Sequence, residues 1–182
     1  MSREGRREIA ARRLAREFAL LGIYQWLLHK FPAQDAPLSL PEQPPQVQLD
    51  ALKELLASTT PETLERKVGS RLPPDADFFA ALLQGAVREA PETRGIIEPL
   101  LTRTIAELSP VEHAILLLSV FELRHDTETP YRVVINEAIE LAKKYGGADG
   151  HKFINGVLDR LVANLRPEEV AFVRAQEPGK KG

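Results

Sequence analysis

Apolar residues recur every three or four positions along most of the chain, which is the spacing of amphipathic helices. The alternation of apolar and polar residues that is typical of strands is almost absent. The first pattern predicts a helix over about residues 6–30, whose apolar face widens beyond Arg16. We therefore expect this helix to be mostly buried after Arg16. The residues of its apolar face are Ile9, Leu14, Phe18, Leu20, Leu21, Ile23, Leu27 and Leu28.

Prolines separate this first helix from the rest of the chain. Five prolines between residues 32 and 45 predict a loop near residues 32–46, because proline lacks a backbone N–H group. Two short helices are expected after this loop, over about residues 47–57 and from Pro61 onward.

Two further helices are predicted before residue 109. Asp75 or Asp77 is expected to cap a helix that runs to about residue 89. Pro91 is expected to open a helix that continues to about residue 108, with a kink or a change of direction at Pro99.

The clearest helix start is the segment Ser109-Pro110-Val111-Glu112. Serine is a preferred cap, proline is tolerated in the first turn, and a glutamate three residues after the serine can close a capping box. The helix predicted from here to His125 is apolar nearly all round and is expected to be central. Three more helices are predicted over about residues 130–145, 150–165 and 168–175. The chain is thus predicted to be all-α, with seven to nine helices.

Composition narrows the class of protein. Hydrophobic residues make up 43% of the chain and charged residues 27%, as in ordinary soluble domains. Cysteine is absent, which excludes disulfides, thiolate metal sites and a cysteine nucleophile. The start of the chain is a poor signal peptide, and the longest apolar run, residues 114–121, is too short to span a bilayer. We expect a soluble, cytoplasmic protein.

Charge is distributed unevenly along the chain. Six arginines and only two acidic residues fall in the first sixteen positions, although the whole chain has a net charge of −2. Positive charge at the start of a helix opposes the helix dipole, which suggests a reason outside the fold, such as a phosphate backbone. A solvated, frayed terminus explains the charge equally well, and composition alone leaves both readings open.

Other motifs carry weaker signals. Trp26 is expected in the core, whereas the hydroxyl of Tyr24 needs a polar partner or solvent. The segment His151-Lys152-Phe153 fits a nucleic-acid contact or an ordinary helix start equally well. The histidines lack metal-ligand spacing, and the glycines at 146–150 follow no predicted strand. No catalytic residue, metal site or cofactor is expected.

Three segments together resemble the NusB family of bacterial transcription antitermination factors. The first runs from Arg12-Arg13-Leu-Ala-Arg16-Glu17 to Tyr24-Gln-Trp26. The second is Pro-Tyr-Arg-Val-Val-Ile-Asn-Glu-Ala-Ile-Glu-Leu-Ala-Lys at 130–143, and the third is His-Lys-Phe-Ile-Asn-Gly-Val-Leu-Asp at 151–159. The resemblance covers about residues 12–26 and 108–161. It implies two packed helical bundles, with the long first helix in one of them.

The resemblance also implies a function without catalysis. Members of the family bind the boxA element of nascent single-stranded RNA together with NusE, a small-subunit ribosomal protein. The complex joins RNA polymerase and suppresses termination, notably in ribosomal RNA operons. By position, the implied RNA-binding residues of this chain are Arg12, Arg13, Arg16, Tyr24, Glu112, Asp149, Lys152 and Phe153. The acidic members of this set are expected to accept hydrogen bonds from base edges or to order basic side chains.

Several alternatives stay open at this point. One is a NusB-like accessory module of ribosomal RNA cytosine methylation, although the chain has no catalytic cysteine. Another is a protein-interaction bundle that does not bind RNA. A homodimer is also left open. For domain organisation we expect a mobile basic extension over residues 1–10, one helical domain over residues 11–175 and a disordered tail over residues 176–182.

Overall fold

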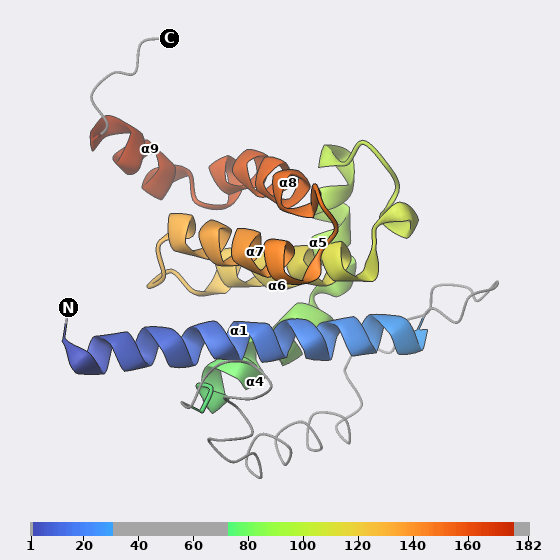
Figure 1. The fold of residues 1–182 in the computed structure, drawn as a ribbon. Helices are drawn as coiled ribbons and strands as arrows, with labels where there is room; N and C mark the ends of the chain where they lie inside the picture. Colours follow the sequence, from blue (N-terminus) through green and yellow to red (C-terminus); the bar gives the residue numbers. More distant parts are fainter. Residues whose placement is uncertain (1, 31–72, 177–182) are drawn as a thin grey trace. The chain divides into compact units, whose positions relative to one another are not determined.

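The computed structural model describes residues 2–30 and 73–176, and the chain divides into two compact units, Met1–Ala90 and Pro91–Gly182. The described residues form seven α-helices and two short 3-10 helices, with no strand among them (Figure 1). The all-α prediction is confirmed. The predicted proline-rich loop near residues 32–46, the helix predicted near residues 47–57 and the one predicted from Pro61 lie outside the described residues.

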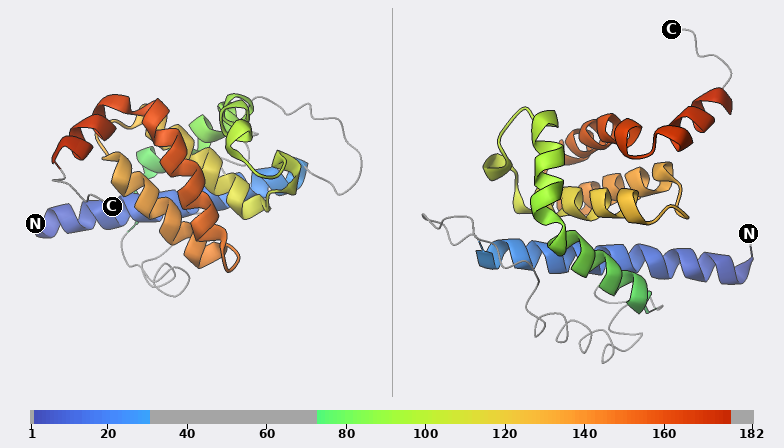
Figure 2. Two further views of the ribbon diagram at one scale, coloured as in Figure 1. Left: turned by 90° about the horizontal axis from the view of Figure 1, so that it is seen from above. Right: turned by 180° about the vertical axis from the view of Figure 1, so that it is seen from behind.

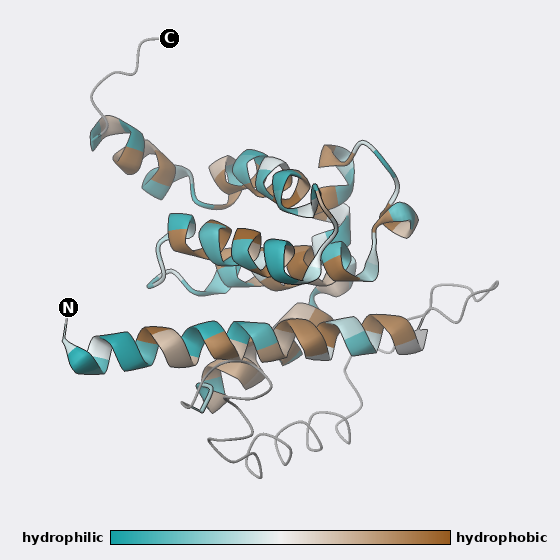
Figure 3. Cartoon of the chain, viewed as in Figure 1, coloured by the Kyte–Doolittle hydropathy of each residue, from teal (hydrophilic) through white to brown (hydrophobic). Residues whose placement is uncertain are grey.

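The first unit contains α1 (Arg3–Lys30) and α4 (Ala76–Arg88), which pack side by side (Figure 2). Along α1 the residues change from mostly hydrophilic to mostly hydrophobic (Figure 3). Asp75 caps α4 as predicted, since its carboxylate accepts a hydrogen bond from Phe78 N at 3.0 Å. The Asp75 N–H donates to Ala11 O at 3.1 Å. This bond places the start of α4 beside the part of α1 where Arg12 and Arg13 lie. The buried apolar residues of the pair are Leu14, Ala15, Ala19, Leu20, Ile23, Trp26, Leu27, Phe79, Leu82, Leu83, Ala86 and Val87.

Burial of α1 follows the sequence pattern with two exceptions. Trp26 is buried, which confirms its predicted place in the core. Ile9 and Leu28, which we expected on the buried face, are 50% and 45% exposed. Ile9 lies before Ala11, where α4 begins alongside. Leu28 is two heptads beyond Leu14, and an α-helix drifts by about 20° per heptad from an exact seven-residue repeat, so it leaves the buried face.

The second unit is built around one nearly fully buried helix. α6 (Pro110–His125) is buried at every position from 112 to 123, which confirms the predicted central helix. α7 (Tyr131–Tyr145) and α8 (Gly150–Leu165) pack on α6 and on each other, and α9 (Pro167–Gln176) packs on α8. The unit also includes α5 (Ala90–Ile97), which begins at the boundary residue, and the 3-10 helices η1 (Glu98–Leu100) and η2 (Ile105–Glu107).

The continuous helix predicted from Pro91 to about residue 108 is wrong. α5 ends at Ile97, and Pro99 lies in η1. Proline cannot donate a backbone hydrogen bond, so the α-helical pattern does not continue through Pro99; one 3-10 turn follows α5 and the backbone becomes extended at Leu101. Thr104 then opens η2 with its own capping box to Glu107. Residues 101–104 therefore form a connection, and Arg103 lies in it.

The caps of the helices in the second unit come from both local and distant residues. The Ser109–Glu112 capping box is present. Asp149 holds the N-cap position of α8, but its side chain makes no capping hydrogen bond. The first N–H group of α7, that of Tyr131, donates a hydrogen bond of 2.9 Å to Glu169 Oε1. A carboxylate from α9 therefore caps α7. A local pattern cannot show such a cap, because its partner lies 38 residues away.

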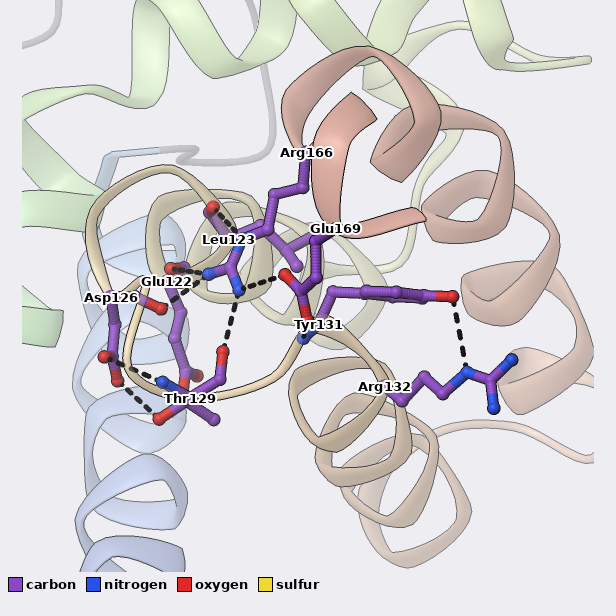
Figure 4. A network of polar contacts seen from close by, with 8 residues as sticks. All are labelled: Glu122, Leu123, Asp126, Thr129, Tyr131, Arg132, Arg166 and Glu169. Atoms are coloured by element: carbon purple, nitrogen blue, oxygen red, sulfur yellow. Dashed lines mark hydrogen bonds and ion pairs between the residues drawn. The ribbon is translucent and has the colours of Figure 1, made fainter. Parts of the chain in front are cut away.

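A buried arginine ties together the end of α6, the loop after it and α9 (Figure 4). Arg166 is 7% exposed. Its Nε donates to Leu123 O at 2.6 Å, Nη2 to Glu122 O at 3.2 Å and to Asp126 O at 2.6 Å, and Nη1 to Thr129 O at 2.7 Å. Nη1 also pairs with Glu169 Oε2 at 3.1 Å. The guanidinium thus donates to carbonyls at the C-terminal end of α6 and in the loop after it, and one of them, Glu122 O, also accepts from Asp126 N at 2.9 Å.

Histidine 113 on α6 makes the stability of the second unit depend on pH. Burial, together with the charge of Arg94, lowers the pKa of His113 to about 3 from an ordinary value of 6.5. Its Nε2 accepts a hydrogen bond from Arg94 Nε at 3.0 Å, which requires a neutral imidazole nitrogen. The unfolded chain binds a proton at this histidine below about pH 6.5, whereas the folded chain does so only near pH 3. The contribution of neutral His113 to stability is therefore fully present above pH 6.5, and it is lost as the pH falls from 6.5 toward 3.

We expect the free energy of unfolding to fall between about pH 6.5 and 5, with a slope approaching 1.4 kcal/mol per pH unit from this one group. Urea unfolding followed by circular dichroism measures it, and His113→Gln, which cannot titrate, should have a flatter profile. Equal slopes for the two proteins would show that His113 is not the titrating group.

Candidate nucleic-acid interface

Two of the three predicted arginines on α1, Arg12 and Arg16, contact one aromatic ring. The guanidinium carbon of Arg12 lies 4.3 Å from the centroid of the Phe78 ring, and that of Arg16 lies 5.1 Å from it. Arg13 is exposed and Arg12 is half-buried, whereas Arg16 is only 5% exposed. We call Arg12, Arg13, Arg16 and Phe78 the α1 cluster. Contact with the ring limits the freedom of two long cationic side chains, since cations are attracted to aromatic faces.

Tyr24 lies on the same side of α1 as Arg13. Eleven residues separate them, which is close to three helical turns, so the two positions differ by roughly 20° around the axis and by about 16 Å along it. Tyr24 is half-buried. An extended single strand of nucleic acid that contacts Arg13 and continues along this face of α1 would reach Tyr24 after a few nucleotides.

The other predicted residues lie in the second unit, at the starts of α6 and α8. Glu112 in the first turn of α6 has both carboxylate oxygens engaged. Oε2 accepts from Ser109 N at 3.0 Å and Ser109 Oγ at 2.7 Å, and Oε1 accepts from Arg103 Nη2 at 2.8 Å. Burial opposes ionisation of this carboxyl, but the hydrogen bonds from Ser109 and Arg103 outweigh it and hold the pKa of Glu112 below its ordinary value. Glu112 is therefore a buried carboxylate.

Arg103 is the residue of this region that the sequence did not reveal. Its guanidinium carbon lies 4.4 Å from the centroid of the Phe153 ring, while its Nη2 pairs with Glu112. The side chain of Arg103 is 35% exposed and that of Glu112 is 12% exposed. We call Arg103, Glu112 and Phe153 the Arg103 stack. The sequence signal that could have pointed to Arg103 is Pro99, because a helix that ends near this proline leaves residue 103 in a connection.

Asp149 and Lys152 form a separate pair at the start of α8. The distance from Lys152 Nζ to Asp149 Oδ1 is 2.8 Å, and the side chains are 73% and 78% exposed. An ion pair this exposed stabilises little and opens readily, so Lys152 stays accessible to an anion. Gly150 connects this end of α8 to the Arg103 stack, since a Cβ atom added there would lie 3.9 Å from Glu112 Oε1.

The predicted site residues thus fall into two groups, one in each unit. Arg12, Arg13, Arg16 and Tyr24 share α1, and Glu112, Asp149, Lys152 and Phe153 share the starts of α6 and α8. Within the described ranges, no three histidine, aspartate or glutamate side chains are close enough to hold a metal ion. None of the helices in this part of the chain has the length and hydropathy needed to cross a membrane.

Comparison with known proteins gives a consistent result. The model of the family described as "NusB family" matches residues 13–163. The transcription antitermination protein NusB of Bordetella pertussis is 48% identical over 163 residues, which is 88% of this chain and 91% of the relative. The same protein of Aromatoleum aromaticum is 45% identical over 166 residues, covering 91% and 97%. Among solved structures, T. maritima NusB aligns with a TM-score of 0.64 at 25% identity, covering 88% of this chain and 96% of that one.

Proposed function

Because this chain belongs to the NusB family, we propose that it works as a transcription antitermination factor by binding boxA-type single-stranded RNA together with NusE. The observation that supports RNA binding best is the α1 cluster, in which half-buried Arg12 lies over the Phe78 ring and the next residue, Arg13, is exposed. Arginine matches phosphate oxygens with paired donors and also stacks on bases, which suits single-stranded RNA. Lys152 at the start of α8 supplies a further accessible cation.

The proposed role is assembly, and it requires no catalytic group, metal or cofactor. A net charge of −2 with a basic start favours RNA that approaches through α1, because the rest of the chain is acidic. Simultaneous contact of RNA with this chain and with NusE raises the overall affinity through effective concentration. The assembly would then join the antitermination complex on RNA polymerase, and we place the protein in the cytoplasm for that reason.

A capture experiment tests this proposal. Immobilised boxA RNA is incubated with the full chain, with and without NusE, and a scrambled RNA of equal length is the control. We expect weak retention of the chain alone, stronger retention with NusE, and little on the scrambled RNA. Failure of boxA RNA to retain the chain even with NusE would reject RNA binding and favour the interaction-bundle alternative.

A further inference from the structure

We propose that Arg103 binds an unpaired RNA base in the second unit and that Glu112 acts through Arg103 as a positioning residue. This inference rests on the proposed RNA-binding function and assigns the chemistry of one part of that site. It changes the expectation for Glu112, which the sequence placed in direct contact with RNA.

The hydrogen bonds of Glu112 argue against direct contact. Its carboxylate has about four acceptor positions. Three of them are used, by the two donors of Ser109 and by Arg103 Nη2. The side chain is also only 12% exposed. A base edge would have to displace a capping bond or the ion pair to reach this carboxylate, whereas Arg103 already lies at the surface.

The surroundings of Arg103 fit a stacking platform. Phe153 lies 4.4 Å from the guanidinium carbon, and the ion pair with Glu112 fixes the guanidinium from the side of α6. A guanidinium has five N–H groups, and the bond to Glu112 uses one of them. A base can stack on the face of the guanidinium opposite Phe153, while the remaining N–H groups, which lie in the plane of the guanidinium, stay available to neighbouring acceptors of the same RNA strand.

Charge decides between a base and a phosphate as the ligand of this stack. The carboxylate 2.8 Å away neutralises most of the positive field of Arg103. A neutralised arginine releases few counterions when RNA binds, so it adds little to the salt dependence of affinity. The arginines of the α1 cluster, by contrast, lie in a segment of net positive charge, with six arginines and two glutamates in the first sixteen positions of the chain. The α1 cluster and the Arg103 stack therefore differ in a measurable property, the salt dependence of RNA binding.

Binding of boxA RNA with NusE to the full chain, measured over a range of salt concentrations, tests the inference. We expect Arg103→Ala to lower affinity roughly tenfold, as for the loss of one stacked base, with almost no change in the salt slope. Glu112→Gln should lower affinity by a smaller factor, and adding it to Arg103→Ala should cause no further loss. Arg124→Ala is the matched control, because it removes a partner of the 2.7 Å ion pair with Glu92 elsewhere in the same unit.

The outcomes separate this inference from the proposed function. If Arg103→Ala binds like the wild type while the wild type binds boxA RNA, only the assignment of Arg103 fails. Independent, additive losses from Glu112→Gln and Arg103→Ala would show that Glu112 contacts RNA directly. A large fall in salt slope for Arg103→Ala would identify a phosphate ligand instead of a base. Thermal unfolding confirms that each variant is folded, and Arg103→Lys, which keeps the charge but stacks poorly, should also bind weakly.

Discussion

Replacement of Arg166 by methionine should lower the free energy of unfolding of the second unit by about 3–5 kcal/mol. The guanidinium donates to four backbone carbonyls and to Glu169, and the residue is 7% exposed. Methionine fills part of the volume but supplies no donor, so each of these acceptors loses its hydrogen bond from Arg166. Because Glu169 also caps α7, the loss of Arg166 should loosen α7 and α9 together.

The two units can be observed separately in this measurement. Trp26 is the one tryptophan of the chain and lies in the first unit, so its fluorescence reports on that unit, while far-ultraviolet circular dichroism reports on all helices. Arg166→Lys should lower the free energy of unfolding by less than Arg166→Met does. Its ammonium group still donates hydrogen bonds, but it cannot reach all five acceptors. Arg174→Ala, at an exposed position of α9, should change stability by less than about 0.5 kcal/mol. A similarly small loss for Arg166→Met would contradict the role given to the network.

Loss of both Arg12 and Arg13 should weaken RNA binding about a hundredfold at about 0.15 M salt. Each arginine is expected to make one charge-assisted contact with a phosphate, and each such contact contributes a slope of about −0.7 to the salt dependence for a single strand. The double alanine variant should therefore reduce the magnitude of the slope by about 1.4. Fluorescence anisotropy with labelled boxA RNA measures both quantities.

The neighbouring arginines provide a matched control for charge alone. Arg6 and Arg7 are exposed and lie on the same helix, so their double alanine variant removes the same charge. If contact at the α1 cluster matters, this control should lose only a few-fold in affinity. Equal losses for the two double variants would show that the basic end acts by charge and that no particular arginine is positioned. Arg16→Ala should act mainly on stability, because Arg16 is only 5% exposed.

Sequence patterns predicted the helices of this fold well where the signals for a helix lie within that helix. The segment from Ser109 to Glu112 carries its own capping box, and the predicted ends of α6 and α8 match the structure. Leu28 was misplaced because a heptad count ignores the drift of a straight helix. The helix through Pro99 was overextended because apolar spacing continued past a residue that cannot sustain it.

Long-range partners could not be predicted from local patterns. Arg166 bonds to carbonyls 37 to 44 residues away, and nothing near it in the sequence distinguishes it from a surface arginine. Arg103 pairs with Glu112, nine residues along, across a connection that the sequence predicted as helix. The sequence shows that residue 112 is a glutamate, but it does not show that this carboxylate pairs with Arg103. The contact of Phe78 with two arginines also has no local signal, because it depends on how α4 packs on α1.

The salt dependence of boxA RNA binding by the unmodified chain is the most direct test of the proposed function. With phosphate contacts from Arg12, Arg13 and Lys152, the logarithm of the association constant should fall with the logarithm of salt concentration with a slope of about −2. A slope near zero, or equal affinity for boxA RNA and for a scrambled strand at every salt concentration, would contradict recognition of RNA by these residues.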